Sequence, residues 1–193
     1  MLEEFVKEAI DRIQPGDVEV VYVDEGSGII VEDEGGVTIK VGVNDSRRSI
    51  LKAIALAKAY NDPELVSIWA VTDELRQKPH SREGSLALLA RVVDYVLVTA
   101  GYLSYVIEDF DKDYLRRLVT SVEPNVKVKA IKVLGLDVPF SIEKAGLKPD
   151  EGFEDVVKGI NDPFIRNYIK LRTYLLNNTS LEYLLNYLNL IFR

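Results

Sequence analysis

The pattern of hydrophobic and polar positions divides the chain into an N-terminal helix, a run of short strands and a long helical remainder. Apolar residues recur at helical spacing over residues 2–13, and Pro15 follows directly after. Runs of β-branched residues then cover 18–23, 28–32 and 37–43, with Gly-containing turns between them. This order predicts an α+β fold in which a three-stranded antiparallel meander packs against helices.

Three helices are predicted to follow the sheet. The first is capped at Asp45-Ser46 and runs to about Asn61, and the second begins at Asp62-Pro63. The third covers residues 85–107 and is apolar on nearly every side, with only Arg91 and Asp94 charged. A helix of this kind is buried on most faces, so we expect it at the centre of the fold.

Glycine and proline positions suggest the boundaries in the second half. Gly101 is interpreted as a bend or close contact within the central helix rather than its end. Residues 124–135 alternate like a strand but begin with Pro and end with Gly, which favours a short helix. Residues 139–152 are interpreted as a loosely ordered link. The chain is therefore predicted to form an α+β core domain over 1–121 and a helical subdomain over 122–193, or one continuous domain.

The last two predicted helices, over 163–176 and 181–192, are expected to form a helical hairpin. They are rich in Tyr and Leu on more than one face. A helix with two apolar faces at the end of a chain packs inside or meets a second chain. The residues singled out for an interface are Tyr183, Leu184, Tyr187 and Leu188.

Composition excludes several classes of function. The chain has no Cys, which excludes disulfides, thiolate nucleophiles and zinc fingers. Residues 1–45 hold 12 acidic and 3 basic residues in a chain of net charge −7, so nucleic acid is an unlikely partner. No run reaches the roughly 18 apolar residues that span a bilayer. We therefore expect a soluble cytoplasmic protein, and the scarcity of thermolabile residue types favours a thermophilic source.

The alternating carboxylates of Asp109, Asp111 and Asp113 are the candidate metal ligands. In a calcium loop that starts at Asp109, the position of the essential Gly is Tyr114 and that of the bidentate Glu is Thr120. Capping of a helix by Asp109 or Asp111, with Asp113 in its first turn, needs no such residues and is the favoured interpretation.

Two further motifs carry candidate chemistry. Arg47 and Arg48 stand at the start of a predicted helix, where free N–H groups favour an anion, although Asp45 already supplies negative charge there. His80 is the only histidine, so a metal site or a catalytic triad that needs an imidazole would have to use it. Its polar surroundings favour a solvated loop residue.

The order of helix, three strands and two helices over residues 2–77 is similar to the minimal core of zincin-type zinc metallopeptidases. In that family the helix after the sheet carries the H-E-x-x-H motif. The nearest counterpart here is the Ile54–Lys58 stretch, which holds neither zinc ligand nor general base. The resemblance therefore implies a metal-free relative without peptidase activity.

These patterns predict a non-catalytic interaction or scaffolding protein that self-associates through its C-terminal helices and needs no cofactor. The alternative is an enzyme or small-ligand-binding protein that uses carboxylate and Arg side chains. The sequence alone does not decide between an enzyme and a binding protein.

Overall fold

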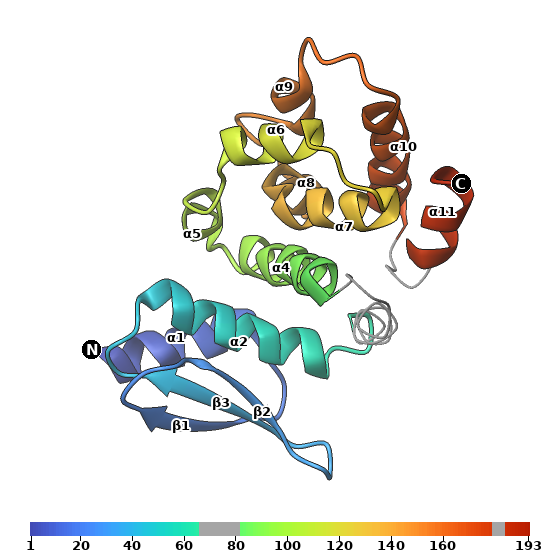
Figure 1. The fold of residues 1–193 in the computed structure, drawn as a ribbon. Helices are drawn as coiled ribbons and strands as arrows, with labels where there is room; N and C mark the ends of the chain where they lie inside the picture. Colours follow the sequence, from blue (N-terminus) through green and yellow to red (C-terminus); the bar gives the residue numbers. More distant parts are fainter. Residues whose placement is uncertain (66–81, 179–183) are drawn as a thin grey trace.

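The computed structural model describes residues 1–65, 82–178 and 184–193, in which a small sheet, two covering helices and a helical body lie in successive layers (Figure 1). The predicted helix after Asp62 lies outside the described residues from position 66 on, and so does His80. The elements are α1 (Leu2–Ile13), β1 (Glu19–Val23), β2 (Gly28–Val31), β3 (Val37–Gly42), α2 (Arg47–Asn61), α4 (Arg82–Thr99), α5 (Leu103–Ile107), α6 (Lys112–Thr120), α7 (Val126–Leu136), α8 (Val138–Lys144), α9 (Phe153–Val157), α10 (Pro163–Asn177) and α11 (Leu184–Ile191).

The three strands form a mixed sheet, so the prediction of a purely antiparallel meander was wrong. The spatial order is β1-β3-β2, with β1 parallel to β3 and β2 antiparallel to β3. β3 is buried at nearly every position, whereas β1 and β2 are largely exposed. The central strand is therefore the most buried of the three, because neighbours cover both of its edges, although it comes last in the sequence.

The link from β1 to β2 passes over the end of β3. Strands two positions apart are about 10 Å from each other, and the four residues 24–27 can reach about 13 Å when extended. Asp45 holds this link, because its Oδ2 accepts hydrogen bonds from Ser27 N and Ser27 Oγ, both at 2.7 Å. The Ser27 hydroxyl in turn accepts from Gly42 N at 2.9 Å, at the end of β3.

We expect Asp45→Ala to lower the urea midpoint of unfolding at neutral pH and to have little effect in strong acid. Hydrogen bonds from the side chain and backbone of Ser27 hold the pKa of Asp45 below its ordinary value. A depressed pKa contributes stability above the pKa of the unfolded chain, and that contribution is lost as pH falls through the folded pKa. Urea unfolding at pH 7 and in strong acid, where the carboxylate is protonated in both states, tests this.

Asp24→Ala is the matched control for this substitution. Asp24 lies in the same link, and its carboxylate accepts no hydrogen bond from the residues that the structure describes. Equal losses for the two variants at pH 7, or a loss for Asp45→Ala that persists in acid, would contradict the proposed clamp.

α2 has the predicted cap and lies between the sheet and α4 (Figure 1). Ser46 is the N-cap, and its hydroxyl accepts a hydrogen bond from Ser49 N at 3.2 Å. Four alanines and three larger apolar residues of this helix are buried. Small side chains let α2 approach both the sheet and α4 closely, which is why it occupies the middle layer.

α4 is central, as predicted, but it ends earlier than expected. Gly101 adopts a φ of 87°, Gly101 N donates to Val98 O at 3.1 Å, and Tyr102 N donates to Leu97 O at 2.8 Å. This pair of hydrogen bonds is the Schellman arrangement that closes a helix with a left-handed Gly. The interpretation of Gly101 as a bend inside one long helix was therefore wrong.

The helix predicted after Pro124 is confirmed as α7, with Asn125 as its N-cap. The loosely ordered link predicted from residue 139 was wrong over α8. Asp137 caps α8, Pro139 lies in its first turn, and Phe140 and Ile142 are buried. Proline at the start of a helix gives the same signal in the sequence as proline in a loop, and burial separates the two.

Two hydrophobic clusters lie on different sides of α4. One joins α4 through Val93, Val96 and Leu97 to the sheet, α1 and α2. The other joins α4 through Leu88, Leu89 and Val92 to the helices from α6 to α11. The division of the chain at residue 121 stays a prediction.

Candidate functional site

The two arginines predicted to hold an anion have partners within the chain. Arg48 forms ion pairs with Asp109 and, at 3.9 Å, with Glu108. The guanidinium of Arg47 lies 5.0 Å from the centre of the Phe5 ring. The structure therefore separates the two side chains instead of directing both at one ligand.

The three aspartates predicted as metal ligands do not converge either. Asp109 pairs with Arg48 and with Lys52, whose Nζ lies 2.6 Å from Asp109 Oδ2. Asp111 is the N-cap of α6, where Oδ1 accepts from Tyr114 N at 2.7 Å, and Asp113 lies in the first turn. Capping of this helix is confirmed. Within the described ranges, no group of three or more His, Cys, Asp or Glu side chains is placed to hold a metal ion.

The charged groups of greatest interest are Arg91 and Asp94, which lie in the middle of α4. Their side chains are almost fully buried, with residue exposures of 4% for Arg91 and 3% for Asp94. Arg91 Nη2 donates to Asp94 Oδ2 at 2.5 Å. Two charges on an otherwise apolar helix were visible in the sequence, but the sequence did not show that both would be buried.

Arg91 is incompletely paired. Its Nε and Nη1 have no hydrogen-bond partner in the described part of the chain. A buried polar group without a partner costs roughly 1–3 kcal/mol, and more when it is charged. The guanidinium has five N–H donors, and Asp94 takes one of them. Arg91 is thus a buried cation with free donors.

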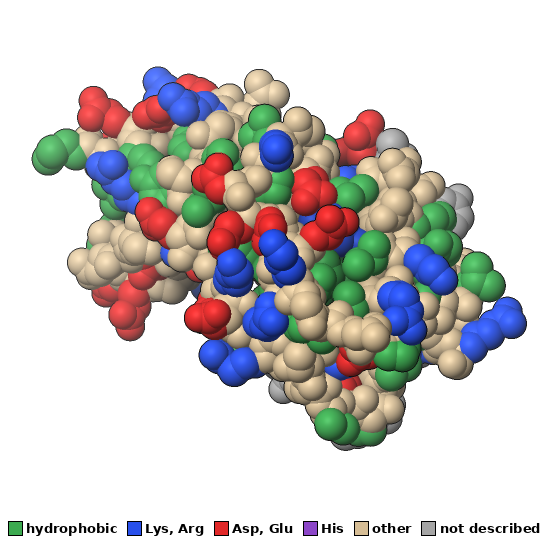
Figure 2. All heavy atoms as spheres, turned by 90° about the horizontal axis from the view of Figure 1, so that it is seen from above, with side chains coloured by type: hydrophobic (Ala, Val, Ile, Leu, Met, Phe, Trp, Pro, Cys, Tyr) green, Lys and Arg blue, Asp and Glu red, His purple; other side chains and the backbone are tan. Residues whose placement is uncertain are grey.

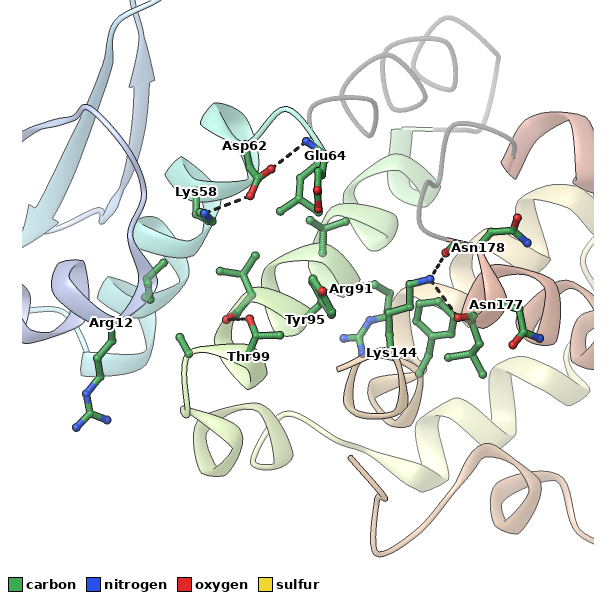
Figure 3. A pocket seen from close by; sticks show the side chains of 17 residues that line it. Arg12, Lys58, Asp62, Glu64, Arg91, Tyr95, Thr99, Lys144, Asn177 and Asn178 are labelled. Atoms are coloured by element: carbon green, nitrogen blue, oxygen red, sulfur yellow. Dashed lines mark hydrogen bonds and ion pairs between the residues drawn. The ribbon is translucent and has the colours of Figure 1, made fainter. Parts of the chain in front are cut away.

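A cavity of about 480 Å³ lies beside Arg91, between α4 and the ends of α1, α2 and α10 (Figure 3). Its wall includes the apolar side chains of Val92, Val96, Phe140 and Leu176. Four cations and two carboxylates line it among the described residues: Arg12, Lys58, Arg91, Lys144, Asp62 and Glu64. The lining is therefore net positive in a chain whose net charge is −7.

Three of these cations have partners in the chain. Lys58 pairs with Asp62 at 3.2 Å, and Arg12 pairs with Glu8 at 2.8 Å. Lys144 Nζ donates to the carbonyl of Leu175 at 2.5 Å and to other carbonyls at the end of α10 (Figure 3). Arg91 differs from them because its donors without a partner are buried.

A second cavity, of about 630 Å³, lies between α2, α4 and the segment from α5 to α8. Lys52, Asp94 and Asp109 line it, and Arg91 lines both cavities. Burial raises the pKa of Asp94, and the positive charges of Arg91, Lys52 and Arg48 oppose this effect. Burial also lowers the pKa of Lys52, against the charge of Asp94. Pairs of perturbed groups in a cavity are typical of functional sites.

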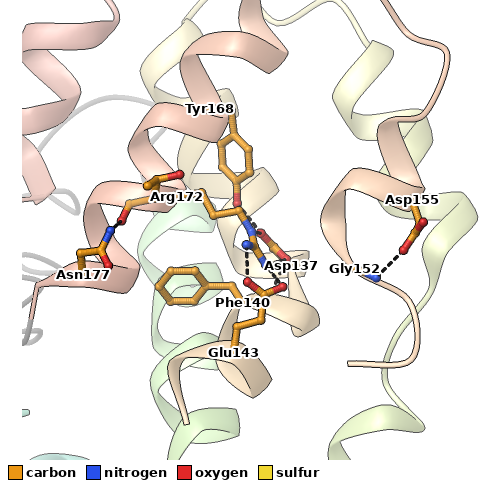
Figure 4. Close-up of polar contacts among 9 residues, drawn as sticks. Asp137, Phe140, Glu143, Gly152, Asp155, Tyr168, Arg172 and Asn177 are labelled. Atoms are coloured by element: carbon orange, nitrogen blue, oxygen red, sulfur yellow. Dashed lines mark hydrogen bonds and ion pairs between the residues drawn. The ribbon is translucent and has the colours of Figure 1, made fainter. Parts of the chain in front are cut away.

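A second buried charge network links α8 to α10 (Figure 4). Asp137 accepts from Tyr168 Oη at 2.9 Å and from Arg172 Nε at 2.7 Å. Arg172 Nη1 also donates to Glu143 Oε2 at 2.7 Å. The guanidinium of Arg172 is paired with two carboxylates, unlike that of Arg91. We therefore interpret this network as a structural contact between α8 and α10.

The C-terminal residues predicted to form an interface pack mainly inside the chain. Leu184 and Leu188 are buried in the larger hydrophobic cluster. The ring of Tyr187 stacks on Tyr174 of α10, with 3.7 Å between ring centres. Tyr183 lies outside the described residues. Self-association through these helices stays a prediction.

The outer surface shown in Figure 2 is mixed in character. Acidic and basic side chains lie side by side on this face, and apolar side chains occur in small separate groups. A face of this kind lacks the large field of one sign that attracts a polyanion.

Comparison of the chain with known protein families, with curated proteins and with solved structures finds no match. Within the described ranges, no helix combines the length and the hydrophobicity that crossing a membrane requires.

Proposed function

We propose that this protein binds a small amphipathic anion in the cavity between α1, α2, α4 and α10. The acidic head of the ligand, a carboxylate, sulfonate or phosphate, bonds to the guanidinium of Arg91. Its apolar part lies against the side chains that line the cavity. The observation that carries the proposal is the buried guanidinium with unused donors at the wall of a cavity.

The preference for an anion follows from charge and geometry. A guanidinium offers pairs of parallel N–H groups that match the oxygens of a carboxylate or phosphate. Asp94 occupies a single donor of Arg91, so one edge of the guanidinium remains for a ligand. The surplus of cations in the lining adds a favourable field.

The preference for an apolar body follows from the rest of the wall. Val92, Val96 and Phe140 contribute hydrophobic surface on the α4 and α8 sides, and Leu176 contributes it from α10. A cavity of about 480 Å³ lies within the usual range for small-molecule sites. Apolar walls with a few convergent polar groups are the normal composition of such sites.

Binding of octanesulfonate and octanoate, measured by isothermal titration calorimetry, tests the proposal. We expect Arg91→Met to weaken both by about 10- to 100-fold, because hydrogen bonds to charged groups contribute roughly 1.5–3 kcal/mol. Arg91→Lys keeps the charge but loses the planar edge, so its affinity should lie between those of the wild type and Arg91→Met.

Arg117→Met is the matched control, because Arg117 is exposed on α6, where it lies over the Tyr114 ring. Octanol and inorganic sulfate separate the contribution of the tail from that of the charge. Equal affinity of wild type and Arg91→Met for octanesulfonate would overturn the proposal. So would the failure of the wild type to bind either octyl anion at millimolar concentration.

A further inference from the structure

Asp94 occupies one donor of Arg91, next to the donors that remain for an anionic ligand. The two side chains are three residues apart on α4, and one hydrogen bond of 2.5 Å joins them. Arg91 lines both cavities, whereas Asp94 lines the 630 Å³ cavity but not the 480 Å³ cavity. Arg91 thus connects the proposed anion site with a carboxylate that the ligand itself does not reach.

The other groups that face Asp94 leave Arg91 as its direct partner. From α2, Lys52 and Arg48 lie close enough to influence its charge. Both are already paired with Asp109, which lies between α5 and α6. Gly135, Leu136 and Val138 face the same cavity and carry no ionisable side chain.

We infer that Asp94 and the ligand compete for the positive charge of Arg91, so that anion binding and proton uptake are coupled. This inference rests on the proposed function. In the empty protein the Asp94 carboxylate partly neutralises Arg91. An anion that docks on Arg91 brings a second negative charge beside Asp94, and Asp94 is relieved of that repulsion when it accepts a proton.

The direction of the pH dependence follows from linkage. Burial raises the pKa of Asp94 in the empty protein, and the charge of a bound anion raises it further. At a pH between the pKa of Asp94 without ligand and its higher pKa in the complex, the complex holds more protons than the ligand-free protein. Affinity for an anion therefore increases as pH falls through this interval and levels off below it.

The carboxylates of the anion cavity itself titrate as well. Asp62 and Glu64 line that cavity, together with Lys58 and Lys144. Protonation of either acid would also favour an anion. The part of the pH dependence that belongs to Asp94 is therefore the part that disappears in a variant without this carboxylate.

The experiment is calorimetric titration with octanesulfonate, which stays ionised, between about pH 4 and pH 8. Buffers of different ionisation enthalpy report the number of protons taken up. We expect wild-type affinity to increase about tenfold or more on acidification, with net proton uptake, as is usual for coupled sites. Asp94→Asn should bind about tenfold more tightly than wild type at pH 7 and show a flatter profile.

Asp111→Asn is the matched control. Asp111 lines the same cavity as Asp94 but caps α6, and Asn retains the cap. This variant should keep the wild-type profile. If Asp94→Asn does not fold, the wild-type proton count still tests the inference, because binding without proton uptake overturns it.

The inference and the proposed function fail in different ways. Binding of octanesulfonate that is independent of pH, or equal pH dependence in wild type and Asp94→Asn, overturns the role of Asp94 alone. Absence of octanesulfonate binding at every pH overturns the proposed function.

Discussion

Asp137→Ala is expected to lower the free energy of unfolding by about 3–5 kcal/mol, the usual effect of breaking a buried ion pair. Asp137 is fully buried and accepts from Phe140 N, Tyr168 Oη and Arg172 Nε at 2.7 to 3.0 Å. Burial alone lowers the pKa of Arg172, but the charge of Asp137 and the bond to Glu143 raise it above its ordinary value. Removal of Asp137 therefore leaves a buried cation and a buried hydroxyl with too few acceptors.

Asp111→Ala is the matched control for that variant. Asp111 and Asp137 are both N-caps, but Asp111 is exposed and its carboxylate accepts a single backbone hydrogen bond. The loss of an exposed cap costs about 1 kcal/mol. Urea unfolding of the two variants measures the difference between them. Equal losses would show that the Tyr168 and Arg172 contacts contribute no stability beyond the cap.

Gly135→Ala is expected to destabilise the protein by about 1–3 kcal/mol, the usual effect of overpacking, although Ala is the better helix former. Gly135 is buried in α7, against α4. A Cβ at this position would lie 2.6 Å from the Cα of Ala87. Because the obstacle is backbone, the two helices must separate to accept the methyl group.

Gly28→Ala provides the comparison for Gly135→Ala. A Cβ at Gly28 meets no atom within 4 Å, and its φ is not in the left-handed region. We expect this variant to unfold at nearly the wild-type temperature, and Gly135→Ala to unfold several degrees lower. Similar thermal midpoints would mean that α4 and α7 do not depend on their close approach.

Both substitutions probe the surroundings of α4. Gly135 sets how closely α7 lies against it, and the network around Asp137 connects α8 to α10 on the side of the larger hydrophobic cluster. The same helix carries Arg91 at the wall of the proposed anion cavity. We therefore expect Gly135→Ala to be the more harmful of the two to ligand binding, because a shift between α4 and α7 moves Arg91 directly.

The local elements were determined by the sequence to a large extent. The Asp45-Ser46 cap predicted α2, and the Pro and Gly positions of residues 124–135 predicted α7, because such signals act through backbone neighbours in the same segment. Capping by Asp111 was predictable for the same reason. The central position of α4 followed from its lack of a polar face.

The strand order and the candidate site were decided only by the tertiary structure. A short Gly-containing link can join two neighbouring strands in a hairpin, or it can pass over the end of a strand that lies between them. The hydrogen bonds of Asp45 to Ser27 hold the link in the second arrangement. Likewise, Arg91 and Asp94 could have faced solvent on an isolated helix. They are buried because α2, α7 and α8 surround α4. Charge burial and cavities depend on residues far apart in sequence, and a periodic pattern along one segment carries no information about such contacts.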